Sequence, residues 1–116
     1  MKLAIPLLFF FALALAFANT PGQHSVTLTW TEANCPSCTF NVYRGSATGV
    51  CKGVVTPYAK GITLDTYQDT AVQPGSTYVY AVSAVNGGVE SSCSAELQIA
   101  LQPSPSVPTN LQGVAN

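Results

Sequence analysis

The sequence predicts an all-β fold, a two-sheet antiparallel β-sandwich of about six or seven strands. Short segments in which apolar and polar residues alternate follow one another over residues 26–101. A Gln-Pro-Gly turn at residues 73–75 precedes the most apolar of these segments. No segment after residue 18 has the period of a helix. Together these observations leave little of the chain for any other class of fold.

The first eighteen residues are of a different kind. Lys2 gives a positive start, residues 3–17 are apolar, and residues 16–18 read Ala-Phe-Ala, which fits a signal-peptidase site. A membrane anchor is the alternative, but the apolar run is short for a span. We therefore expect a signal peptide over residues 1–18, cleavage after Ala18, and a secreted, extracellular or periplasmic protein with no membrane attachment.

The first two strands are expected at residues 25–30 and 39–44, where alternation is clear. In the first, Trp30 is the natural centre of a core. In the second, Tyr43 falls on the outward face. The two strands are separated by a loop that contains Cys-Pro-Ser-Cys.

The middle of the chain is less regular. Residues 45–53 are rich in Gly, Ser and Thr, which indicates a connection. Residues 54–62 are weakly patterned and interrupted by Pro57, which suits an edge strand. Residues 63–68 are expected to form a further short strand that carries Leu64.

The strongest strand is expected at residues 77–85, which are nearly all apolar or aromatic and therefore predict a central strand covered on both faces. Residues 86–88 (Asn-Gly-Gly) predict a hairpin turn. Residues 93–101 alternate and form the returning strand. The side chains expected in the core are Trp30, Phe40, Val42, Tyr78, Tyr80, Val82 and Leu97.

The four cysteines, Cys35, Cys38, Cys51 and Cys93, predict two disulfides, because an even number in a small exported chain is typical of such bonds. Three pairings are possible, and Cys35 with Cys38 and Cys51 with Cys93 is the favoured one. A redox role for Cys35 and Cys38 would require a helix N-terminus to lower a thiol pKa, and none is expected. Zinc binding is less favoured still.

Composition excludes several classes of binding partner and site. Only 8% of residues are charged and the formal net charge is −1, which argues against nucleic acid and against an anionic membrane surface. His24 is the single histidine and is expected at a solvated strand end. Asp65 and Asp69 could form a carboxylate pair, but neighbouring threonines indicate turns. We expect no catalytic residues, no metal site and no cofactor.

Aromatic side chains offer one alternative. Tyr43, Tyr58 and Tyr67 could form an exposed patch on which sugars stack, although cross-strand packing is the more usual role of such tyrosines.

Six segments resemble, in order, a fibronectin type III module of the bacterial secreted kind, which implies an immunoglobulin-like sandwich. They read Val-Thr-Leu-Thr-Trp (26–30), Phe-Asn-Val-Tyr-Arg-Gly (40–45), Thr-Tyr-Gln-Asp (66–69), Pro-Gly-Ser-Thr-Tyr (74–78), the strand at 79–86, and Glu-Ser-Ser-Cys-Ser-Ala-Glu (90–96). The resemblance implies that Trp30 is the core tryptophan of the second family strand and that the Tyr78 hydroxyl caps a backbone group.

The resemblance also implies a non-catalytic binding or structural module whose partner is a protein or a polysaccharide. Candidate binding loops follow the two strands that end at one pole of the sandwich, with Glu32, Asn34, Ser37, Asn86, Gly87 and Glu90 as the candidate residues. The chain departs from the family in its cysteines, in having no Arg-Gly-Asp at residues 86–92, and in lacking an apolar first strand before residue 25.

Residues 103–108 form a stiff Pro-rich linker, and residues 105–113 resemble the missing first strand. The favoured interpretation is a disordered linker. Alternatively, the tail docks on its own domain, or residues 105–114 complete a second molecule in a head-to-tail assembly. We divide the chain into the signal peptide (1–18), the domain (19–102) and the linker with its tail (103–116).

Overall fold

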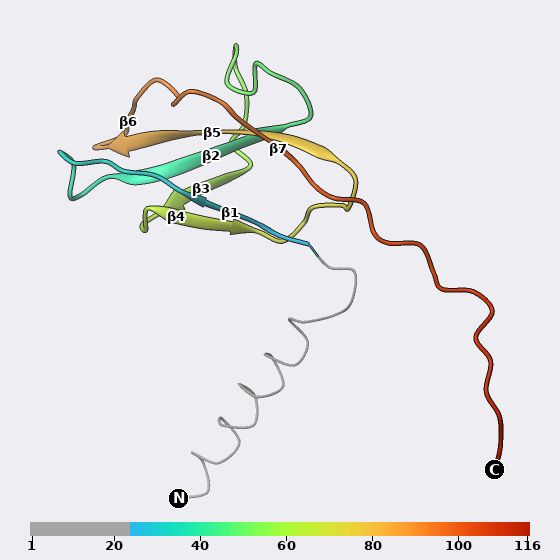
Figure 1. The fold of residues 1–116 in the computed structure, drawn as a ribbon. Helices are drawn as coiled ribbons and strands as arrows, with labels where there is room; N and C mark the ends of the chain where they lie inside the picture. The colour runs from blue at the N-terminus through green and yellow to red at the C-terminus, as the bar shows by residue number, and fades with distance from the viewer. Residues whose placement is uncertain (1–23) are drawn as a thin grey trace, which may run out of the picture.

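The computed structural model describes residues 24–116, so the predicted signal peptide lies outside the described residues. Seven strands form two facing antiparallel sheets (Figure 1). They are β1 (Val26–Thr29), β2 (Thr39–Gly45), β3 (Ala59–Ile62), β4 (Thr66–Asp69), β5 (Thr77–Asn86), β6 (Val89–Glu90) and β7 (Leu97–Ala100). The predicted all-β sandwich is confirmed, and the described part of the chain forms no helix long and apolar enough to span a bilayer.

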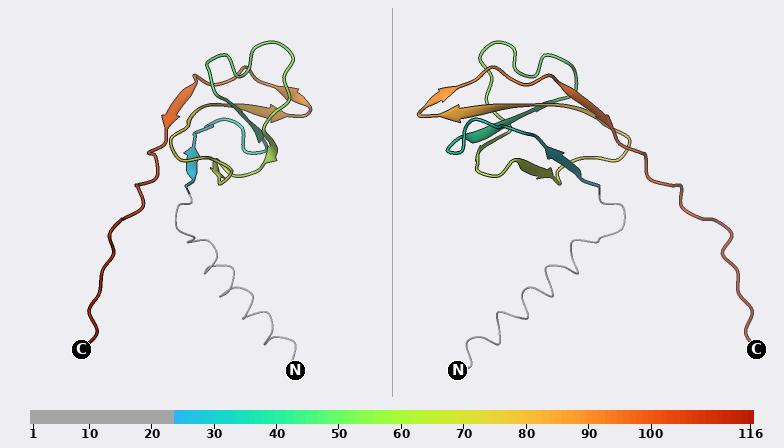
Figure 2. Two further views of the ribbon diagram at one scale, coloured as in Figure 1. Left: turned by 90° about the vertical axis from the view of Figure 1, so that its right-hand side faces the viewer. Right: turned by 60° about the vertical axis from the view of Figure 1, so that its left-hand side comes forward.

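The two sheets differ in size, as the side views in Figure 2 show. Within residues 24–116, β1 pairs only with β4, whereas the larger sheet has the order β3-β2-β5, with β6 and β7 pairing in turn along the far edge of β5. Tyr58, next to β3, meets Tyr67 of β4 with ring centroids 6.5 Å apart, so β4 lies beneath the β3 side. The unpaired edge of β1 therefore faces the β7 side, which we call the open side.

An apolar core fills the space between the sheets. Val26 and Leu28 enter it from β1, Val42 from β2 and Tyr80 from β5, and none of them is more than 5% exposed. Full burial of a side chain of this size stabilises the fold by about 1.5–3 kcal/mol. Around this cluster pack the partly buried Trp30, Tyr78 and Val82 and the buried Phe40, whose ring meets that of Trp30 edge-on at 5.3 Å.

The prediction that Leu97 belongs to the core is wrong. Leu97 lies opposite Tyr80 and therefore on the inner face of the sheet, yet it is 50% exposed. The reason is its place on the open side, where no strand of the described residues lies beneath β7.

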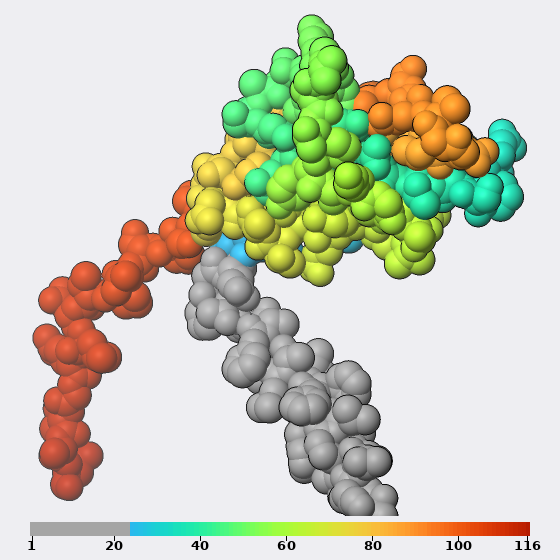
Figure 3. Space-filling view, turned by 180° about the vertical axis from the view of Figure 1, so that it is seen from behind, coloured from blue at the N-terminus to red at the C-terminus, as the bar shows by residue number. Residues whose placement is uncertain are grey.

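β5 is covered on both faces, as its composition predicted. Val79 and Ala81 point to the outer face and are 1% and 2% exposed. Residues 46–58, here called the covering loop, lie over this face (Figure 3). Within this loop, Cys51 is bonded to Cys93 of the segment beside β5. Tyr43 points outward as predicted, but the covering loop leaves it only 6% exposed.

The predicted strand at residues 93–101 is broken in the structure. Six residues (91–96) lie opposite only four of β5 (81–84). Here serine side chains take the place of backbone acceptors: the N–H groups of Val82 and Ala84 donate to Ser94 Oγ at 3.0 Å and Ser91 Oγ at 2.9 Å.

Local turn chemistry agrees with the sequence. Gly87 and Gly88 both have positive φ, 60° and 81°, as a two-residue hairpin turn requires. The Tyr78 hydroxyl accepts a hydrogen bond from the Gln73 N–H at 2.9 Å, which is the backbone cap that the resemblance implied. β3 and β4 are shorter than predicted, and Leu64 lies in the connection between them, 64% exposed.

Candidate functional site

Three connections meet at one end of the sandwich, here called the loop end. They are residues 30–38 between β1 and β2, 63–65 between β3 and β4, and 87–88 between β5 and β6. The strand registers place all three at the same end, because β1 pairs with β4 and β2 pairs with both β3 and β5. The two loops predicted from sequence are thus brought together. The connection at residues 63–65 was not predicted, because residues 63–68 were expected to form a strand.

The first loop is held by the bond between Cys35 and Cys38, the pairing that the sequence favoured. The N–H of Cys38 also donates to the carbonyl of Cys35 at 3.2 Å, so the motif forms a tight turn. No helix begins here, and a helix N-terminus is what commonly lowers a thiol pKa in such motifs. The disulfide and this hydrogen bond together fix the shape of the loop.

A pocket of about 190 Å³ opens between the loop at residues 30–38 and the connection at residues 63–65. Glu32, Pro36, Thr63 and Asp65 line it, and all four are exposed. Two carboxylates and a hydroxyl at its rim are hydrogen-bonding groups suited to a neutral, hydroxyl-rich ligand. Asn34 and Ser37 of the same loop are exposed as well, and so are Asn86 and Gly87 of the hairpin.

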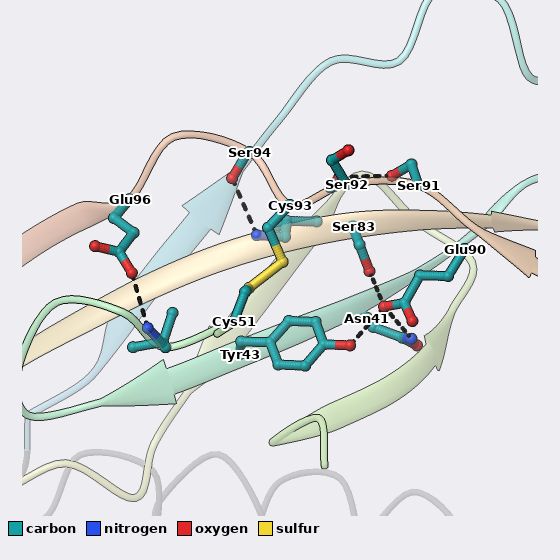
Figure 4. Close-up of a disulfide and its surroundings, with 12 residues drawn as sticks. Asn41, Tyr43, Cys51, Ser83, Glu90, Ser91, Ser92, Cys93, Ser94 and Glu96 are labelled. Carbon is teal, nitrogen blue, oxygen red and sulfur yellow. Dashed lines mark hydrogen bonds between the residues drawn. A yellow bond between two sulfur atoms is a disulfide. The ribbon is translucent and has the colours of Figure 1, made fainter. Parts of the chain in front are cut away.

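Glu90, the last of the predicted loop residues, is engaged within the protein. Its Oε2 accepts hydrogen bonds from the hydroxyls of Ser83 and Tyr43, both at 2.5 Å, and from Asn41 Nδ2 at 3.1 Å (Figure 4). These bonds lower the pKa of Glu90 below its ordinary value, the one from Ser83 most. The hydrogen bond to Glu90, followed by burial, raises the pKa of Tyr43.

Asp69 is the centre of a second internal cluster at the opposite end of β4. It is 1% exposed. Its Oδ2 accepts from Arg44 Nη1 at 2.9 Å and from the Tyr80 hydroxyl at 2.7 Å. Its Oδ1 accepts from the Tyr58 hydroxyl at 2.9 Å and the Ala71 N–H at 3.1 Å. Each oxygen of the buried carboxylate therefore accepts two hydrogen bonds, which replace the bonds to water that burial removes.

Electrostatics follow from this geometry. Burial favours the neutral acid, but the hydrogen bonds from Tyr80, Arg44 and Tyr58 outweigh it and hold the pKa of Asp69 below its ordinary value. Burial, and then the bond to Asp69, raises the pKa of Tyr80. The Arg44 guanidinium lies over the Tyr58 ring, 4.0 Å from its centroid. The cluster is structural, and Asp65, at the far end of β4, is no partner for Asp69 in acid–base chemistry.

The three tyrosines considered for sugar stacking do not come together. Tyr43 is buried beneath the covering loop on the outer face, whereas Tyr58 and Tyr67 meet at the β3–β4 side. His24 lies two residues before the start of β1 and is partly buried. Within residues 24–116, no three His, Cys, Asp or Glu side chains gather as a metal ion would need.

Known proteins resemble this chain in two ways, in sequence over a small part of long enzymes and in structure over most of single domains. No family model matches it. It is 38% identical over 78 residues to an amylopullulanase of Thermoanaerobacter thermohydrosulfuricus, a match that takes in 66% of this chain and 5% of that enzyme. An amylopullulanase of Thermoanaerobacterium saccharolyticum is 37% identical over 67 residues, 58% of this chain and 5% of the enzyme. The chain thus spans about a twentieth of the length of these curated relatives.

Solved structures match over much more of their length. An Fn3-like protein from Clostridium thermocellum has a TM-score of 0.57 and 37% identity, and the match covers 78% of this chain and 86% of that one. The fibronectin type III domain of human fibronectin type III domain containing protein 3 has a TM-score of 0.57 at 18% identity, covering 74% and 80% of the two chains. The second likeness supports the fold alone.

Proposed function

Because the chain belongs to the fibronectin type III family, we propose that it is an exported, non-catalytic binding module whose loop end holds a polysaccharide. The observation that carries the proposal is the distribution of polar groups. The carboxylates of Asp69 and Glu90 are engaged within the fold, whereas Glu32, Asn34 and Asp65 stand exposed together at the loop end. A binding surface is what this distribution favours, because exposed carboxylate and amide groups offer hydrogen bonds to the hydroxyls of a sugar chain.

Export is supported by the predicted signal peptide and by two disulfides, which persist in oxidising compartments. The polysaccharide is supported by the relatives, since segments similar to this chain occur in enzymes named amylopullulanase. Pullulan is therefore the first polymer to test. The disulfide at Cys35–Cys38 would keep the first loop in its binding shape and so lower the entropy lost on binding.

The test is electrophoresis of the native protein through gels with and without pullulan. Pullulan should retard the wild-type protein, and Asn34→Ala and Asp65→Asn should reduce the retardation. Gln98→Ala, an exposed change on β7 away from the loop end, should leave it unchanged. If pullulan and amylopectin both leave the mobility unaltered, or if Gln98→Ala acts as strongly as Asn34→Ala, binding of such glucans at the loop end is disproved.

A further inference from the structure

The open side of the sandwich has an unpaired strand edge. The Trp30 N–H donates to the carbonyl of Asp65, next to β4. Backbone polar groups alternate between the two edges of a strand, so those of Leu28 also point toward β4, where the Leu28 carbonyl accepts from Thr66 Oγ1. The N–H and C=O groups of Thr27 and Thr29 therefore point to the other edge, where β1 has no partner among the described residues.

The inner surface next to this edge is apolar and incompletely covered. Leu97 of β7 is 50% exposed although it faces inward. Farther along the open side, a pocket of about 210 Å³ lies between Trp30 and residues 91–94, with Val82 in its wall. The Trp30 Nε1–H is buried and has no hydrogen-bond partner within residues 24–116. An exposed leucine, a free backbone edge and an unmet donor together define an acceptor groove for an extended segment.

The C-terminal tail has most of the properties of such a segment, and Asn110, whose φ is 58°, would become extended on binding. Beyond Pro103, which rests against Gly75, residues 104–116 are exposed and extend away from the sandwich (Figure 2). Val107 and Leu111 are 83% and 97% exposed. After Pro108 the tail contains no proline, so every residue there can donate a backbone hydrogen bond.

Every strand pair among the described residues is antiparallel, and for an antiparallel tail the chain direction decides which molecule can receive it. β7 ends, and the tail departs, at the end opposite the loop end, where β1 begins. To pair antiparallel with its own β1, the tail would first have to run back along the whole sandwich to the loop end. The tail of a second copy can enter the groove at the loop end and run in the required direction directly.

We propose that residues 105–114 of one molecule bind in the acceptor groove of a second copy, antiparallel to β1. Residues opposite each other in an antiparallel pair share a face. The hydrogen-bonding residues of the β1 edge, Thr27 and Thr29, point outward, so those of the tail point outward too. This arrangement suits the polar Asn110 and Gln112 and turns Leu111 inward toward the core. The contact joins unlike surfaces, so each added copy offers a new groove or tail.

The first test is sedimentation velocity of the chain without the predicted signal peptide, residues 19–116, from micromolar to millimolar concentration. Mass should grow with concentration beyond the dimer. Leu111→Asp should weaken association about tenfold or more, because it places a charge where a leucine is buried. Gln112→Asp is the matched control, since it adds the same charge on the outward face. It should change the dissociation constant of the assembly by about twofold at most. A monomer at every concentration, or equal effects of the two variants, would overturn the proposal.

A second test locates the groove. The full-length Leu111→Asp protein is mixed with a synthetic peptide of residues 103–116, and amide hydrogen exchange is followed. The peptide should slow exchange at Thr27 and Thr29. Protection of these amides in the monomeric wild-type protein would show docking on its own domain instead, and no peptide effect at millimolar concentration would show no groove. Either outcome rejects exchange between copies.

Discussion

The two faces of the five-stranded sheet are covered in different ways. The inner face is closed by apolar side chains from β1, and its buried core residues are at most 6% exposed. The outer face is closed by the covering loop, which leaves Val54 wholly exposed and Val55 42% exposed. That loop is held instead by the Cys51–Cys93 bond and by Glu96, whose Oε2 accepts from the N–H groups of Gly49 and Val50 at 2.7 and 2.8 Å.

The difference shows that a small domain can bury both sides of its central strand with only one apolar core. The inner face relies on hydrophobic burial, which does not depend on redox conditions. The outer face relies on a disulfide, which a reductant can break, and on charge-assisted hydrogen bonds. Variants on the two faces should therefore separate in size of effect and in their dependence on redox state and pH.

The largest effect is expected from Asp69→Ala. It leaves the Arg44 guanidinium and the Tyr58 and Tyr80 hydroxyls without their shared acceptor. Leaving such a group unpaired costs about 3–5 kcal/mol, to be measured as the free energy of unfolding in urea. Tyr80→Phe, which removes a single hydrogen bond, should cost about 1–2 kcal/mol. If the two variants lose the same free energy of unfolding, Asp69 is not the shared acceptor of Arg44, Tyr58 and Tyr80.

Replacing Cys51 and Cys93 together by serine tests the outer face. The bond joins residues 42 apart in sequence, and its loss should lower the unfolding free energy by about 3–4 kcal/mol. Trp30 belongs to the inner core, so its near-ultraviolet circular dichroism should persist in the folded variant. A folded variant that had lost this signal would show that the two faces are not independent.

Acid should act on the inner cluster in a defined pH window. The folded-state pKa of Asp69 is lowered, so its contribution to stability is fully present above its ordinary pKa, about 4, and is lost as the pH falls through the lowered value. Urea unfolding at a series of pH values should show this decline. Asp69→Asn should remove most of it, and an unchanged decline would assign it to other groups.

The smallest effect is expected from Glu90→Gln on the outer face. An amide keeps the shape of the side chain but weakens the bonds from Ser83, Tyr43 and Asn41. Glu90 is exposed, so solvent screens the interaction and the cost should be about 1 kcal/mol or less. Tyrosine absorbance during alkaline titration should show the pKa of Tyr43 falling toward its ordinary value in this variant.

Sequence alone predicted the features that rest on local chemistry. Alternation located β1 and β2, apolar content located the central β5, and the Asn-Gly-Gly turn located the hairpin. Features set by distant partners were missed. The exposure of Leu97 depends on what lies beneath β7, and the burial of Tyr43 depends on a loop that starts after β2.

The loop end was half predicted for the same reason. The positions of residues 30–38 and 86–88 followed from strand direction, whereas residues 63–65 join them only because β3 and β4 are shorter than their pattern indicated. The engagement of Glu90 could not be foreseen either, since its partners lie 7 to 49 residues away.

The irregular stretch at residues 91–96 determines which insertions this domain tolerates. It is longer than the facing part of β5 by an even number of residues, so Ile99 still faces the core. Side chains alternate with a period of two, and one more or one fewer residue here would turn Ile99 and Leu101 to solvent.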